Sequence, residues 1–289
     1  MSTPADLLRA WIARQASPEA LAPFEGKRAE LARDPAPRIF AAAFGPVSRR
    51  LGKASLALEL DDLAAAEKAR PGWQPAGLTV DQAARILLLL DTVNAPGTLA
   101  ERLKRLAATA DLGELIAIYT GLPLYPEAET LVPFATDGLR TSVRAVFEAI
   151  AHHNPFPAEH FPQSAWNHMV LKTLFIDSAL HPIAGLDRRW NEKLANMLVD
   201  YANERRAADR PVTPELWRGV GRFGNAAAIA DLARVLAEGN PLAQKAAALA
   251  LSESSQPAAA ETRARRRVLA DAVASGDITW DGVHDETPA

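Results

Sequence analysis

Apolar residues recur along most of the chain at the three- and four-residue spacing of amphipathic α-helices, and no stretch alternates convincingly with the period of two that marks a strand. A capping residue followed by proline marks three helix starts, at Ser17-Pro18, Thr213-Pro214 and Asn240-Pro241. Thr79 to Gln82 has the pattern of a capping box ahead of the apolar run in DQAARILLLLDTV. These signals predict helices at roughly 5–16, 18–33, 37–52, 59–70, 79–93, 97–109, 111–120, 136–152, 162–178, 188–208, 213–222, 225–238, 241–253 and 257–275.

The pattern therefore predicts an all-α fold. Consecutive helices of this length with short connections pack as antiparallel pairs, which gives an irregular helical bundle or an α-solenoid-like array. The pair at 225–253 is most similar to a single HEAT-like repeat, and no fixed period recurs upstream of it. We accordingly predict a helical lobe over 1–210, HEAT-like C-terminal helices over 211–275 and a tail over 276–289, which ends in DGVHDETPA.

Composition narrows the class of protein. Alanine and leucine make up about a third of the 289 residues, 48% of the chain is hydrophobic and 23% is charged, which is typical of a globular protein and excludes the disordered and collagen classes. The net charge of -3 argues against a nucleic-acid partner, and the lack of cysteine excludes thiol catalysis and thiolate metal sites. The longest apolar run, Ile86 to Leu90, is far shorter than the roughly 20 residues of a spanning helix, and the N-terminal MSTPADLLRAWIARQAS lacks a signal-peptide core. We expect a cytoplasmic protein without membrane insertion.

Five of the six histidines fall between His152 and His181, and Glu159 and Asp177 lie nearby, so a nitrogen and oxygen metal site is one alternative. The spacing argues against it, because a helical ligand pair needs residues three or four apart, and here the histidines are adjacent or separated by prolines. We expect His152 and His153 to cap a helix C-terminus instead, and we predict no metal and no cofactor.

A second candidate is the segment WNHMVLKTLFID from Trp166 to Asp177, in which apolar residues occupy every face and Asn167 and Lys172 are the polar exceptions. Such a helix should be central. A lysine there either extends its amine to solvent, pairs with a carboxylate, or has a lowered pKa that suits a base or nucleophile.

Arginine-rich positions offer a third candidate. Arg140 and Arg144 are four residues apart in GLRTSVRAVFEAI, and Tyr201 and Arg205 are four apart in LVDYANERRAADR, where Asp200 also lies. Each set either converges on an anionic ligand or forms solvated ion pairs, and solvated pairs are the commoner outcome.

Motifs of well-known enzymes are lacking. There is no GxxxxGK phosphate loop, the glycines of GVGRFG follow a helix rather than a strand, and no nucleophile elbow or catalytic triad is evident. The basic cluster of Arg263 and Arg265 to Arg267 is best explained by a solvated terminal helix.

The order of several motifs is similar to that of one family: RPGW before TVDQAARILLLL, then ADLGELIAIYTGLPLYP, then HHNPFPAEHFPQSAWNHMVLKTLF, then LDRRWNEKLANMLVDYANERRAADRPVTPELW. The chain resembles the EboA-domain family from about Phe44 to Leu251. It departs from the family pattern at His168, where a glutamine is expected, and at Asn203, where a histidine is expected, and this argues against an obligatory ligand at either position.

The resemblance implies a role in moving a metabolite rather than a defined catalytic reaction. Members are encoded beside a prenyltransferase-like membrane protein, a TatD-like hydrolase and sugar-isomerase-like proteins, in clusters associated with moving secondary-metabolite precursors such as the scytonemin monomer toward the periplasm. The expected partners are therefore a small-molecule precursor or other proteins of the cluster. The motif positions and Arg140 are the predicted ligand-binding residues: Trp73, Arg140, Asn154, Trp166, Asn167, Lys172, Asp200, Tyr201 and Arg205. Pro155, in the turn after Asn154, is a further motif position.

Three hypotheses of function follow, in descending order. The first is a non-catalytic helical protein that binds the metabolite or its pathway proteins. The second is an enzyme that modifies the precursor, with Lys172 as base or nucleophile and Arg140 or Arg205 holding an anionic substrate. The third is metal-dependent hydrolysis at the histidine cluster.

Overall fold

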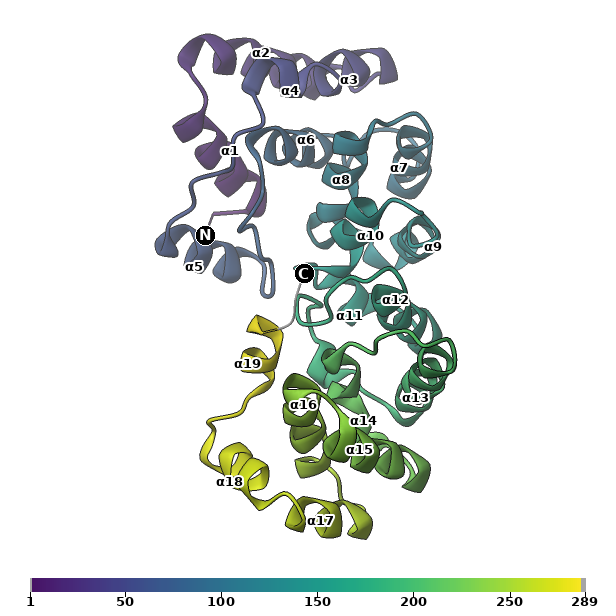
Figure 1. Cartoon of the computed structure of the whole chain (residues 1–289). Helices are drawn as coiled ribbons and strands as arrows, with labels where there is room; N and C mark the ends of the chain where they lie inside the picture. Colours follow the sequence, from purple (N-terminus) through teal and green to yellow (C-terminus); the bar gives the residue numbers. More distant parts are fainter. Residues whose placement is uncertain (1, 287–289) are drawn as a thin grey trace. The chain divides into compact units, whose positions relative to one another are not determined.

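The protein is all-α, as the periodicity predicts (Figure 1). The computed structural model describes residues 2–286, and over these residues α-helices and short 3-10 helices are joined by turns, with no strand beyond an isolated bridge between Ser55 and Thr79. The chain divides into two compact units, Met1–Phe161 and Pro162–Ala289. The division falls after Phe161, whereas the predicted lobe ends at residue 210, inside the second unit.

The first unit contains eleven α-helices and one 3-10 helix within its described residues: α1 (Pro4–Gln15), α2 (Pro18–Arg33), α3 (Pro37–Phe44), α4 (Val47–Leu51), α5 (Leu60–Ala69), α6 (Val80–Asp91), α7 (Leu99–Ala107), α8 (Leu112–Thr120), η1 (Leu122–Leu124), α9 (Ala128–Gly138), α10 (Arg144–Ala151) and α11 (Phe156–His160).

The second unit continues with α12 (Gln163–Phe175), η2 (Leu186–Arg188), α13 (Glu192–Ala207), η3 (Pro214–Gly219), α14 (Val220–Phe223), α15 (Ala226–Glu238), α16 (Pro241–Ser252), α17 (Pro257–Ala264), α18 (Arg267–Ser275) and α19 (Trp280–Asp285).

Helix starts follow the predicted capping chemistry at most sites. The Ser17 hydroxyl accepts from the Ala20 amide at 3.3 Å, and the Asn240 side chain accepts from the Ala243 amide at 2.9 Å. At the predicted capping box, the Thr79 amide donates to Gln82 Oε1 at 3.0 Å. Thr213 differs, because it precedes the 3-10 helix η3 and makes no side-chain cap.

Helix α6 is the centre of the first unit. It contacts α1, α2, α3, α4 and α8, and nearly all of Val80 to Leu89 is buried. The apolar run from Ile86 to Leu90 puts apolar side chains on every face of the second half of this helix, which explains its enclosure by other helices. Within this core Arg85, 1% exposed, pairs with Asp81 at 2.7 Å.

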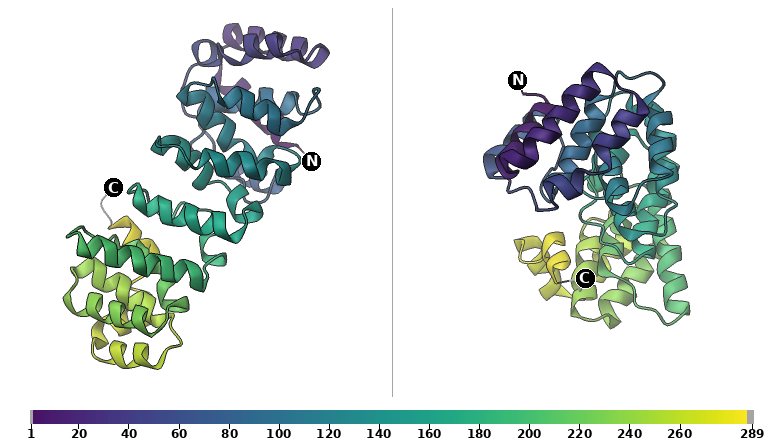
Figure 2. Two further views of the ribbon diagram at one scale, coloured as in Figure 1. Left: turned by 90° about the vertical axis from the view of Figure 1, so that its right-hand side faces the viewer. Right: turned by 90° about the horizontal axis from the view of Figure 1, so that it is seen from above.

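Helix α16 has the same role in the second unit, where α14, α15, α17, α18, α19 and η3 all contact it. Figure 2 shows that the helices of each unit, identified by their colours, lie side by side. The alanines of α16 allow close approach, and Gly221 of α14 lies so near that a Cβ there would stand 1.7 Å from the Ala250 carbonyl oxygen. The predicted pair at 225–253 is present as α15 and α16, which pack against each other, and its HEAT-like character stays a prediction.

One predicted helix and the predicted tail differ from the structure. The predicted helix 136–152 is wrong, because α9 ends at Gly138 and α10 begins at Arg144, with hydrogen-bonded turns between them. The predicted tail also differs from the structure, since residues 280–285 form α19, whose start is capped by Thr279. Residues 287–289 of that tail lie outside the described part of the chain.

Over residues 2–286 no helix combines the length and the apolar character that a membrane crossing requires.

Candidate functional site

Three predicted ligand-binding residues belong to the first unit, and two of them are built into its core. Trp73 is buried, and the centroid of its ring lies 5.5 Å from the centroid of the Trp11 ring. Asn154 is also buried, and its amide donates to the carbonyl oxygens of Tyr119 at 3.1 Å and Ala149 at 3.0 Å. Its Oδ1 accepts from the backbone of the following turn, so Asn154 joins α8, α10 and α11 and has little capacity left for a ligand.

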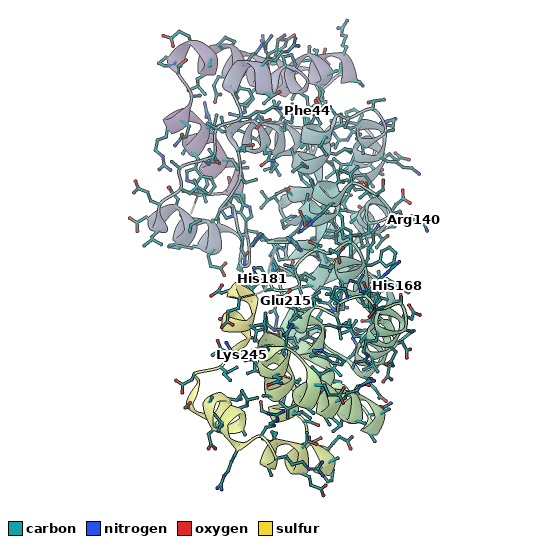
Figure 3. All side chains as sticks on the ribbon, in the orientation of Figure 1. Phe44, Arg140, His168, His181, Glu215 and Lys245 are labelled. Carbon is teal, nitrogen blue, oxygen red and sulfur yellow. The ribbon has the colours of Figure 1, made fainter. Side chains whose placement is uncertain are left out.

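Arg140 is highly exposed, with 86% of its side chain accessible (Figure 3). Its Nε lies 3.8 Å from Oδ1 of Asp137, which is also exposed. Because the chain turns between α9 and α10, Arg140 does not share a helix face with Arg144, which pairs instead with Glu148 at 2.7 Å. Both arginines thus form the solvated ion pairs that were the alternative to anion binding.

The remaining six predicted side chains lie in the second unit, and Trp166 and Asn167 of α12 are fully buried. Asn167 donates to Asn191 Oδ1 at 3.1 Å and accepts from Asn191 Nδ2 at 2.9 Å. Asn191 also caps α13 by accepting from the Leu194 amide. The two amides therefore fasten α12 to the start of α13. Arg189 lies over the Trp166 ring at 4.7 Å.

Lys172 is half-buried in the same helix, and this burial lowers the pKa of its amine. On α13, Tyr201 donates to the carbonyl of Leu174 at 3.3 Å, and Arg205 donates to the carbonyl of Pro211 at 2.9 Å. Asp200 is exposed. These contacts tie α12 and α13 to their surroundings, and the ligand-binding roles stay predictions.

The adjacent histidines follow α10 as predicted. His152 is the C-terminal cap residue of α10, and His153 has a positive φ of 51° and bonds Gln74 Oε1 through Nδ1 at 2.9 Å. Of the five clustered histidines, His181 alone enters a group of side chains with metal-binding geometry among the described residues, and its companions there were not predicted.

A pocket of about 660 Å³ lies in the first unit between α3, the end of α6 and α7. Its wall is mainly apolar and consists of Pro35, Ala36, Pro37, Phe40, Ala41, Leu89, Ala95, Pro96, Leu99, Leu103 and Leu106. Helix α7 contributes Leu99, Leu103 and Leu106, which share one face at spacings of four and three residues.

The polar groups of this pocket are few. Arg102 donates to the carbonyl oxygens of Thr92 and Val93, and it thereby holds the segment after α6. Within the described structure its Nε is buried without a hydrogen-bond partner, and burial lowers the pKa of this guanidinium. Arg105 and Asp34 are exposed at the wall.

None of the predicted ligand-binding residues lines this pocket within the part of the chain that the structure describes. Its elements were predicted, at 37–52, 79–93 and 97–109, but the wall combines the start of α3, the end of α6 and one face of α7. The sequence signals for this wall are the proline-rich breaks DPAP at the start of α3 and NAPG before α7, together with the leucine face of α7.

A family model described as metabolite traffic protein EboA matches residues 4–221, about three quarters of the 289 residues. The chain belongs to the EboA family. The resemblance was expected from about Phe44 to Leu251, whereas the family match runs from residue 4 to residue 221. The match therefore includes the N-terminal helices before Phe44 and excludes the residues from 222 to Leu251. It includes every residue of the pocket wall. No curated protein and no solved structure matches the chain significantly.

Proposed function

We propose that this EboA-family protein acts in metabolite traffic by binding a small, mostly apolar molecule, without catalysis, in the pocket between α3, α6 and α7. The observation that carries the proposal is the pocket itself. Its volume of about 660 Å³ falls within the roughly 300–1,000 Å³ of small-molecule sites, and its wall combines aliphatic and aromatic side chains with few polar groups.

The polar groups favour a ligand that carries an oxygen acceptor or a negative charge. Arg102 brings a half-buried guanidinium whose Nε is itself buried and has no acceptor among the described residues, and a buried donor without an acceptor costs on the order of 1–3 kcal/mol. A ligand oxygen at that position would remove the cost. Arg105 adds a second positive charge at the wall and Asp34 adds one negative charge, so one positive charge is left in excess among the charged groups that line the pocket.

A bulky substitution in the wall tests this proposal. Ala41 is exposed on α3 and lines the pocket, whereas its neighbour Ala42 is equally exposed and does not. Ala41→Trp should fill the pocket, and Ala42→Trp should leave it open with the same change in composition.

The probe for this test is anilinonaphthalene sulfonate, an aromatic anion whose fluorescence rises in apolar sites. We expect one saturable site on the native protein, at least ~10-fold weaker binding by Ala41→Trp, which corresponds to about 1.4 kcal/mol, and unchanged binding by Ala42→Trp. Equal binding by both variants would exclude this pocket as the site.

A second candidate function is enzymatic modification of the precursor by Lys172. The observation in its favour is the lowered pKa of the half-buried amine, which increases the neutral fraction needed for a base or nucleophile. In that case Lys172→Met abolishes conversion of a pathway precursor while the melting temperature hardly changes. A large loss of stability without any measurable conversion by the native protein would mark the lysine as structural.

A further inference from the structure

Three side chains with metal-binding atoms meet in the second unit, from segments far apart in the sequence. His181 lies in the segment between α12 and η2, Glu215 is the second residue of η3, and His284 lies in α19. One ligand atom from each lies within 4.8 Å of the others. Figure 3 shows His181 and Glu215 side by side next to α19.

Glu215 is the observation that points to a cation. Its side chain is buried, with the residue only 4% exposed, and its Oε2 accepts from the Leu180 amide at 2.8 Å. Among the described residues, Oε1 is buried without a hydrogen-bond partner. A buried carboxylate oxygen needs a positive charge or a donor, because its desolvation is otherwise not offset.

The two imidazoles face this same oxygen. His181 Nδ1 lies 3.7 Å and His284 Nδ1 lies 3.6 Å from Glu215 Oε1, and both distances exceed those of a hydrogen bond. They are close to the separation of two ligand atoms on one tetrahedral zinc ion, which is about 3.3–3.6 Å for bonds of about 2.0–2.2 Å. The two rings are stacked, with their centroids 3.2 Å apart and their planes at 25°, so one imidazole must also rotate for both nitrogens to bind one ion between the three atoms.

Helix α19 is fixed well enough to present its histidine. Val283 is buried, and the Trp280 indole N–H donates to Glu253 Oε1 at 2.7 Å. Lys245 of α16 binds the Glu286 carboxylate at 2.6 Å beyond the end of α19. The packing of α19 on α16 and η3 therefore holds His284 beside Glu215.

We propose that His181, Glu215 and His284 bind one divalent transition-metal ion, with zinc as the ion that this ligand set fits best. Two imidazole nitrogens and one carboxylate oxygen form a zinc set that leaves a coordination position open. The Leu180 amide, through its bond to Oε2, orients the carboxylate. The side chains of His181 and His284 are 33% and 31% exposed, so the open position is accessible to water or a ligand oxygen.

This site is independent of the proposed pocket, because it uses none of the residues that line it. It also joins the family-matched region to the rest of the chain, since His181 and Glu215 lie within residues 4–221 and His284 lies beyond them. The ion would fasten α19 to η3.

Zinc binding by the full, untagged chain tests the proposal. Metal-stripped protein is titrated with ZnCl2 in competition with a chelator of known affinity, and cobalt substitution reports coordination through its visible absorption. We expect one Zn²⁺ per chain. His284→Gln should bind at least ~100-fold more weakly, because loss of a direct ligand outweighs the 10- to 100-fold that outer partners cost.

His168→Gln is the matched control, since His168 is an exposed histidine of the same unit that is not in the group (Figure 3). Glu215→Gln keeps an acceptor for the Leu180 amide and should also lose the ion. If a buried substitution unfolds the chain, hydrogen exchange decides on folded protein: zinc should slow exchange in residues 280–285 of the native chain and not in His284→Gln. The absence of stoichiometric zinc binding by the native chain, or equal binding by His284→Gln, would overturn the proposal.

Discussion

Replacing Asn167 with alanine should destabilise the second unit by about 2–4 kcal/mol, because this buried side chain is hydrogen-bonded to the amide of Asn191 rather than exposed to a ligand. Asn167 is 1% exposed and takes part in three hydrogen bonds, one with Gln163 at 3.0 Å and two with Asn191 at 3.1 and 2.9 Å. At about 1 kcal/mol for each bond the loss is near 3 kcal/mol, and the better helix propensity of alanine returns about 0.6 kcal/mol. The amide of Asn191 loses part of its bonding but keeps its backbone partners.

Urea unfolding followed by tryptophan fluorescence measures this loss, since four of the six tryptophans belong to the second unit. The matched control is Asn203→Ala. Asn203 is exposed on α13 and its side chain accepts from Arg206, so its removal should change the free energy of unfolding by no more than about 0.5 kcal/mol.

Hydrogen exchange locates the effect. The Leu194 amide, which donates to Asn191 Oδ1 at 3.0 Å, should exchange faster in Asn167→Ala. An unfolding curve for Asn167→Ala that coincides with those of the native protein and Asn203→Ala would refute the structural role of the amide pair, and a loss of ligand binding without a loss of stability would favour a role in the site.

Two further predictions concern packing and charge. Gly221→Ala should lower the free energy of unfolding by several kcal/mol or abolish folding, because the added methyl would meet the rigid Ala250 carbonyl at 1.7 Å. Gly26→Ala, which has open space around it, should instead raise the free energy of unfolding by roughly 0.5–1 kcal/mol, and thermal unfolding measures both changes. Asp62 accepts from Arg14, which with further hydrogen bonds lowers the pKa of the carboxyl from 3.8 to about 2. The stabilising contribution of this carboxylate is therefore complete above the unfolded pKa and is lost as the pH falls toward 2. Asp62→Asn should thus lessen the dependence of the free energy of unfolding on acid pH. The same pH dependence of stability in Asp62→Asn and the native protein would contradict this.

The fold could be predicted from local patterns to the extent that each helix carried its own signals. The apolar run of α6 and the Asn240 cap of α16 are sufficient to place both central helices. The break between α9 and α10 was missed because arginines four residues apart look like one helix face, although the structure turns at Leu139 and Arg140. Helix α19 was missed because it is short and polar, and Val283 is its sole buried residue in the described structure.

The sites depend on contacts that no local pattern encodes. The pocket is formed by the start of α3, the end of α6 and one face of α7, so no single spacing in the sequence joins all of its residues. His181, Glu215 and His284 lie on three separate segments, which are brought together by the packing of η3 and α19 on α16 and by the hydrogen bond from the Leu180 amide to Glu215. The helix of Trp166 and Asn167 was predicted to be central, but α12 packs mainly on α13, and α16 is the centre of the unit. Both residues are nevertheless buried, which explains why residues typical of the family need not contact a ligand.

The most direct test of the central claim is a native mass spectrum of the untagged protein purified gently from its own producing cells, with Ala41→Trp and Ala42→Trp prepared in the same way. The account predicts an added mass on the order of a few hundred daltons on the native chain and on Ala42→Trp, as expected for a molecule that fits the pocket, and no such mass on Ala41→Trp. A native chain without bound small molecule, or the same added mass on Ala41→Trp, would contradict ligand binding in this pocket.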